Sequence, residues 1–111
     1  MPSRSIAFMG GVPELLILRV LSEKEMYGYE IAKAVQSTTA DALALGEGVL
    51  YPALHALLGA GALKAHAVTV VGRKRIYYSL TPQGRRRLAT LTKRWRAVSG
   101  AVNTVLGGAY G

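Results

Sequence analysis

The segment from Pro82 to about Leu106 constrains the fold most, because it is long, amphipathic and too large for a small domain to cover alone. Its apolar residues recur in alternating steps of three and four, the heptad spacing of helices that pack on one another. This heptad stripe consists of Leu88, Leu91, Trp95, Val98, Val102 and Val105. A helix of this length measures roughly 37 Å at 1.5 Å per residue. We therefore predict that the stripe forms the interface of a homodimer.

Two other interpretations of the heptad stripe are open at this point. The stripe packs back on its own domain, or the helix lies on a membrane surface with its bases outward. Burial of six apolar side chains contributes roughly 18–36 kcal/mol gross across two chains. Association costs roughly 4–15 kcal/mol. Length and energetics together favour the homodimer.

The preceding residues alternate between helical and strand patterns. Apolar residues recur with a helical period in segments 13–21, 27–37 and 47–58. Segments 65–71 and 75–80 are typical of two short strands, joined by a tight link that contains Gly72, Arg73 and Lys74. We predict a mainly α fold with a small β-hairpin, a winged helix-turn-helix with a long C-terminal dimerisation helix. Residues 1–81 would form the winged domain, and residues 82–111 the dimerisation helix with a short tail.

Charge is divided unevenly along the chain. The net charge is +8, and all six acidic residues lie at or before Glu47. No acid follows among residues 48–111, which hold ten of the fourteen Lys and Arg residues. This excess of positive charge favours a partner that carries many phosphates, such as a nucleic acid.

The composition argues against several function classes. The chain contains no cysteine and only two histidines, so neither a thiolate metal site nor a Ser/His/Asp arrangement is indicated. We expect no enzyme, no metal and no cofactor. The first eleven residues lack the apolar run of a signal peptide, and no stretch reaches the roughly 20 apolar residues that span a bilayer. We expect a cytoplasmic protein without a membrane partner.

Two groups of residues are candidates for contact with double-stranded DNA. On the third predicted helix, Gly48, Tyr51 and His55 lie opposite the leucine side chains. Tyr51 can donate to a phosphate and His55 to a base edge, whereas Gly48 leaves room for a close backbone. A packing tyrosine and a merely exposed histidine are the plainer alternatives. The adjacent bases Arg73, Lys74 and Arg75 are candidates for phosphate contact at the hairpin tip, although a solvated loop is also open.

Three motifs resemble the PadR family of bacterial transcriptional regulators. They are Y-G-Y-E-I at 27–31, L-Y-P-A-L at 50–54 and G-R-K-R-I-Y-Y-S-L-T-P-Q-G at 72–84. The resemblance implies a winged-helix dimer that represses transcription and is released by small, often phenolic or drug-like molecules. It also implies DNA contact by Tyr51, Pro52 and the wing bases, and effector contact by Trp95. The chain resembles the short branch of the family, which has a single C-terminal helix.

Together with this resemblance, which implies repression and release by an effector, the sequence predicts a sequence-specific DNA-binding repressor. It acts as a homodimer on an inverted-repeat operator and is released by a small aromatic effector. Two other functions are open: a nucleic-acid binder without sequence preference, and a protein-interaction module that uses the C-terminal helix. For Trp95 the residues leave two roles open. It either lines a flat apolar slot for an aromatic molecule or simply fills the dimer core.

Overall fold

Three helices form the body of the computed structural model: α2 (Val12–Leu21), α3 (Gly28–Thr38) and α4 (Glu47–Gly59). The structure describes residues 11–109; residues 1–10, where the sequence predicts no signal peptide, and residues 110–111 lie outside the described part. Each helix buries one apolar side, and the fully buried side chains come from all three: Ile17, Leu18, Ile31, Leu54 and Leu57. The three helical segments predicted from periodicity are confirmed to within about two residues at their ends.

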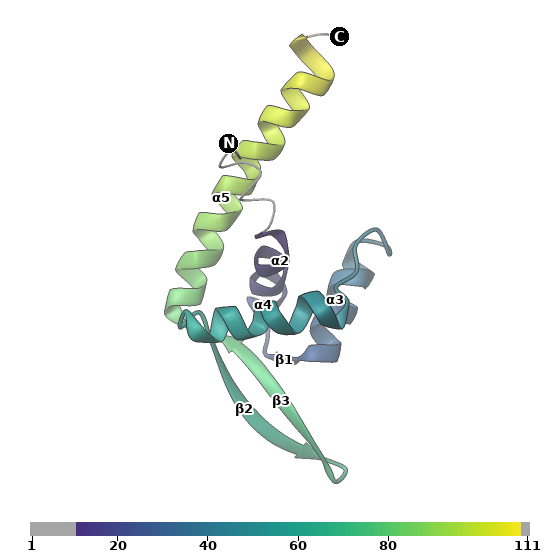
Figure 1. Ribbon diagram of the computed structural model, residues 1–111, viewed down its shortest axis with the longest axis vertical. Helices are drawn as coiled ribbons and strands as arrows, with labels where there is room; N and C mark the ends of the chain where they lie inside the picture. Colours follow the sequence, from purple (N-terminus) through teal and green to yellow (C-terminus); the bar gives the residue numbers. More distant parts are fainter. Residues whose placement is uncertain (1–10, 110–111) are drawn as a thin grey trace.

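A three-stranded antiparallel sheet extends from this helical body. It consists of β1 (Met26–Tyr27), β2 (Leu63–Val70) and β3 (Arg73–Leu80), in the order β1-β3-β2. The strands β2 and β3 form a long hairpin, here called the wing, which projects away from the helices (Figure 1). Only the base of the wing is buried, where Leu63 pairs with Leu80 and Tyr78 enters the core. The outer half therefore has to be stabilised mainly by its own backbone pairing.

The strand ends correct the prediction for the hairpin. The link contains only Val71 and Gly72, with φ of 50° and 74°, and Val70 pairs with Arg73 across it. Two residues with positive φ are enough to reverse the chain, because that twist matches the twist of the flanking strands. Arg73, Lys74 and Arg75 therefore lie in β3 and not in the link or at the tip. The strand β1 was not predicted, because two residues show no periodicity.

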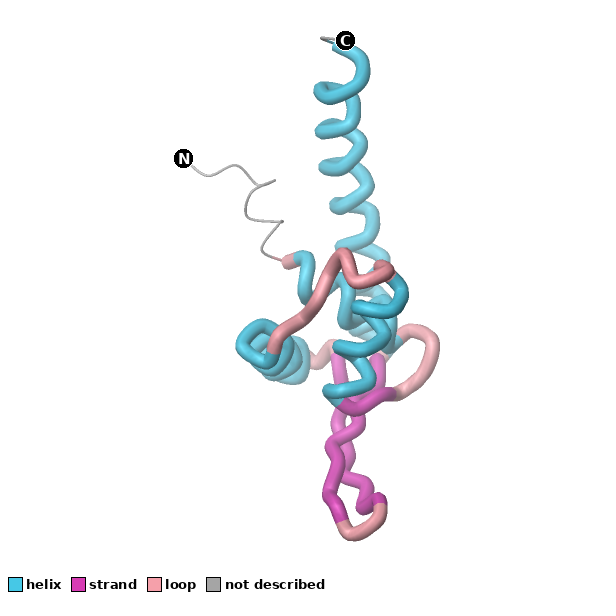
Figure 2. The backbone as a smooth tube through the Cα atoms, turned by 90° about the vertical axis from the view of Figure 1, so that its right-hand side faces the viewer, coloured by secondary structure: helices cyan, strands magenta, loops and turns pink. Residues whose placement is uncertain are grey.

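The helix α5 (Pro82–Thr104) continues into a π-helical turn, Val105–Ala109. Thr81 caps it: its hydroxyl oxygen accepts from the Gly84 N–H at 3.0 Å and donates to the Gly61 carbonyl at 2.6 Å. The helix and the wing extend to opposite ends of the molecule, which is 59 Å in its longest dimension (Figure 2). The mainly α winged helix-turn-helix with a long C-terminal helix is confirmed.

The heptad stripe divides into two parts in the protomer. Leu91 is buried and Leu88 and Trp95 are partly buried against the protomer's own core, where Arg87 also pairs with Glu14 of α2 at 2.9 Å. Further along α5, Val102 and Val105 are 50% and 54% exposed. The interpretation that the stripe packs on its own domain thus holds for the first half of α5 and not for the second half.

Candidate nucleic-acid interface

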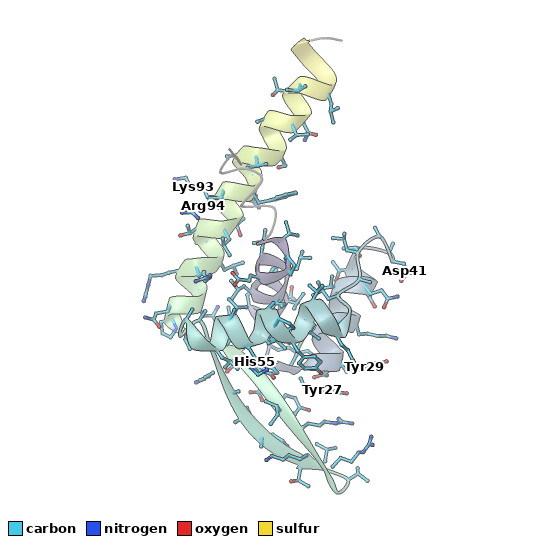
Figure 3. The ribbon with its side chains drawn as sticks, in the orientation of Figure 1. Tyr27, Tyr29, Asp41, His55, Lys93 and Arg94 are labelled. Carbon is cyan, nitrogen blue, oxygen red and sulfur yellow. The ribbon has the colours of Figure 1, made fainter. Side chains whose placement is uncertain are left out.

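One face of α4 is turned to solvent. Leu50, Leu54 and Leu57 are buried on the inner face, whereas the exposed residues of α4 include all four predicted for DNA contact: Gly48, Tyr51, Pro52 and His55. His55 lies on the side of α4 that looks toward the wing (Figure 3). Because Pro52 has no N–H, the carbonyl of Gly48 has no helical donor four residues on. The helix therefore presents an aromatic and an imidazole side chain on its exposed surface.

A cleft of about 280 Å³ separates this face of α4 from the wing. Tyr51 lines it from α4, and Lys74 and Arg75 line it from β3. Its other lining residues are Tyr27, Gly28, Ile76 and Tyr78. Two cations and three tyrosines, with no acidic residue, make this cleft suitable for an anion. The structure thus brings Tyr51 together with two of the three predicted wing bases.

The side chain of Arg75 has a defined place at the cleft. Its guanidinium carbon lies 4.5 Å from the ring centroid of Tyr27, in cation–π geometry. Tyr27 is in turn held by Tyr77, whose ring meets it edge-on with centroids 5.5 Å apart. The stack continues to His66, 5.9 Å from Tyr77, and the His66 Nε2 lies 3.6 Å from a carboxylate oxygen of Glu25. This row of rings across the sheet therefore holds the Arg75 guanidinium in place before any ligand binds.

Tyr51 is positioned by a glycine. A Cβ atom built on Gly28 would lie 2.6 Å from the Tyr51 hydroxyl oxygen, so only glycine lets this hydroxyl approach the start of α3. Behind it, burial raises the pKa of the Tyr78 hydroxyl above its ordinary value of 10.0, and Tyr51 raises it further. A tyrosine is already neutral at physiological pH, and both effects extend this neutral range of Tyr78 to higher pH, so that it does not oppose an anion in the cleft.

The remaining predicted residues lie outside the cleft. Arg73 is exposed further out along the wing, while His55 lies one helical turn beyond Tyr51 on α4. Gly48 has open space within 4 Å of where a Cβ would lie. These residues form a surface that extends from the cleft in two directions, along α4 and along the wing.

Sequence reasoning missed the part played by Tyr27 and Gly28. The motif Y-G-Y-E-I marked both residues but gave no role to either. The missing information was β1, in which Tyr27 pairs with Tyr77 and so reaches the wing. A pairing between residues fifty positions apart leaves no local trace in the sequence.

The described residues hold no group of three or more His, Asp or Glu side chains arranged for a metal ion. Within residues 11–109, no helix combines the length and hydropathy needed to cross a bilayer.

An exposed α4, a cationic wing and a cleft between them define a winged helix-turn-helix protein of the kind that binds DNA. Residues 17–90 match the family model described as the transcriptional regulator PadR-like family. The chain belongs to this family of transcriptional regulators.

Relatives support this placement over nearly the whole chain. The transcriptional regulator Rv3488 of Mycobacterium tuberculosis is 35% identical over 101 residues, which cover 91% of this chain and 89% of that protein. A PadR family transcription regulator from Clostridium difficile is 33% identical, with a TM-score of 0.73 over 87% of this chain and 100% of that one. A transcriptional regulator from Clostridium thermocellum is 28% identical, with a TM-score of 0.79 over 88% of this chain and 95% of that one.

Proposed function

We propose that the protein is a homodimeric, sequence-specific repressor that binds an inverted-repeat DNA operator and is released by a small aromatic molecule. The observation that carries this proposal is the cationic cleft between α4 and the wing, where Tyr51 meets Lys74 and Arg75. A protein that binds such an operator acts where the DNA is, so we propose that it works in the cytoplasm.

The two elements would do different work on DNA. The exposed face of α4 enters the major groove, where His55 reads a base edge and Tyr51 donates to the adjoining phosphate. Pro52 and Gly48 let the groove wall approach the helix closely. Arg73, Lys74 and Arg75 bind phosphates from the wing, and Tyr27 holds the Arg75 guanidinium in place. Because the cation is positioned before binding, less side-chain entropy is lost.

A second chain is proposed to cover the second half of the heptad stripe. Val102 and Val105 are half exposed and Leu106 is 77% exposed, on a helix that projects beyond its own core. Trp95 and Val98 continue this surface toward the core, and Leu88 and Leu91 support it from within the protomer. In this proposal residues 82–111 join two winged domains formed by residues 1–81.

Dimerisation determines the expected geometry of the operator. A two-fold dimer presents two α4 helices, so the operator should be an inverted repeat with half-site centres about 34–36 Å apart, or a multiple of this. Duplexes selected from a random library by the full chain, followed by footprinting, test this. Two protected half-sites on one duplex support the proposal. One asymmetric half-site contradicts it.

Trp95 is proposed as the effector contact, because it lies midway along the heptad stripe and is only partly buried in its own protomer. It is the only tryptophan, so its fluorescence reports on this position alone. Planar aromatic compounds should quench this fluorescence saturably and weaken DNA binding, through their different affinities for the two conformations. Trp95→Phe should remove the effector response and keep the dimer. Absence of saturable quenching across a broad panel makes Trp95 a core residue.

A further inference from the structure

The tip of the wing carries an apolar residue in an unfavourable conformation. Val71 has φ of 50°, in the left-handed region, and its side chain is 96% exposed. It is the first of the two residues of the turn, and Gly72 is the second. In such turns Asn-Gly is the preferred pair, because asparagine and glycine tolerate positive φ.

The fold gains nothing from valine at this position. A β-branched side chain is among the most strained in the left-handed region, and an isopropyl group that is almost wholly exposed buries no apolar area. No contact within the described chain compensates for the strain. Backbone strain that does not stabilise the fold indicates that the residue serves contact with another molecule.

The surroundings of Val71 identify the partner as a polyanion. Arg73 and Lys74 follow the turn directly, and neither wing strand contains an acidic residue. The wing projects away from the helices (Figure 1), and its Lys74 and Arg75 line the cleft described above. If α4 lies in the major groove, the tip of the wing reaches the neighbouring minor groove. This step rests on the proposed DNA-binding function.

We propose that Val71 enters that minor groove and selects A·T pairs there. The minor groove of a G·C pair differs from that of an A·T pair by the guanine 2-amino group, which projects from the groove floor. An isopropyl group cannot accept the hydrogen bond that this amino group offers, and the two compete for the same space. Over A·T pairs the floor is clear and the groove is narrow, so its walls contact the apolar side chain. The strained valine is thus a specificity-determining residue.

The test uses the full chain and a duplex that it has selected from a random library. The pairs under the wing tip are changed from A·T to G·C and to inosine·cytosine, which has the major-groove edge of G·C but lacks the 2-amino group. The wild-type chain should bind the A·T and inosine duplexes within about twofold of each other, and the G·C duplex about tenfold more weakly. This result would show that the wing tip discriminates against the guanine 2-amino group.

Four variants assign this preference to Val71. Val71→Gly and Val71→Asn should reduce the tenfold gap to about twofold. Both should also raise Tm by about 4–8 °C, because they relieve the strain at positive φ. Val71→Ile, which keeps an apolar, β-branched side chain and the strain, should keep the gap. Arg73→Ala should weaken binding to all three duplexes alike, because a phosphate contact carries no base preference.

The outcomes distinguish this inference from the function on which it rests. If Val71→Gly rejects G·C as strongly as the wild-type chain, or if the inosine duplex binds as weakly as G·C, the inference is wrong and the DNA-binding function stands. If the library yields no enriched sequence, sequence-specific binding fails and the inference fails with it.

Discussion

At the scale of single residues, Gly28 is the position where the smallest change should matter most for DNA binding. An added methyl group would displace the Tyr51 hydroxyl, which is the end of a movable side chain, so the fold can adapt. Gly28→Ala should lower DNA affinity about tenfold, the effect of one lost charge-assisted hydrogen bond. The free energy of unfolding should change by less than about 1 kcal/mol, since alanine favours the helix. Fluorescence anisotropy with a selected duplex and chemical unfolding measure the two effects.

Gly100→Ala is the matched control for this prediction. Gly100 lies within α5 with open space around it, so alanine should stabilise the helix by about 0.8–1.0 kcal/mol and leave DNA affinity unchanged. Equal affinity of Gly28→Ala and the wild-type chain would show that Tyr51 does not contact DNA from its observed position.

Thr81 carries a second residue-level prediction, concerning the joint between the wing and α5. Its hydroxyl joins the Gly61 carbonyl to the Gly84 N–H. Thr81→Ala should lower the free energy of unfolding by about 1–2 kcal/mol, because it removes the helix cap and leaves a partly buried carbonyl without its donor. Thr81→Ser keeps the hydroxyl and should recover most of the loss in thermal unfolding. Equal stability of the alanine and serine variants would contradict this role.

At the scale of elements, the two halves of α5 should respond differently to charge. Val102 and Val105 are half exposed in the protomer, whereas Leu91 is 8% exposed in its core. The double substitution Val102→Asp, Val105→Asp should therefore give a folded monomer in sedimentation velocity. A carboxylate at these two positions is exposed in the protomer and becomes costly only when a second chain buries it. Leu91→Asp should instead unfold the protomer. A full-strength dimer of the double variant would refute the proposed interface.

Sequence patterns predicted elements far better than they predicted how elements meet. The helices followed from apolar residues such as Ile17, Ile31 and Leu54, whose spacing shows the buried side directly. The two-residue strand β1 was missed, and so was the contact of Tyr27 with Arg75 that depends on it. The candidate surface on α4 could be predicted because it is the reverse of a leucine stripe. The cleft could not, since it is formed by three segments that only the tertiary fold brings together.

At the scale of the whole molecule, the uneven charge should appear as salt dependence. Each phosphate contact made by a wing base releases counterions, and its loss reduces the slope of log affinity against log salt by about 0.9. Replacing Arg73, Lys74 and Arg75 together by alanine should make this slope shallower and weaken binding to all duplexes alike. His55→Ala should leave the slope unchanged and alter the preference between duplexes. An unaltered slope in the triple variant, from titrations between 50 and 200 mM salt, would remove the wing from the phosphate contacts.

A competition titration tests the central proposal, specific DNA binding by a dimer, most directly. The full chain is titrated at physiological salt with a selected inverted-repeat duplex, against a scrambled duplex of equal length and composition. We expect two chains per selected duplex and a preference of at least about 10³-fold over the scrambled one. Equal affinity for both duplexes would indicate a nucleic-acid binder without sequence preference, and binding to neither would indicate a protein-interaction module. Either result would contradict the proposed function.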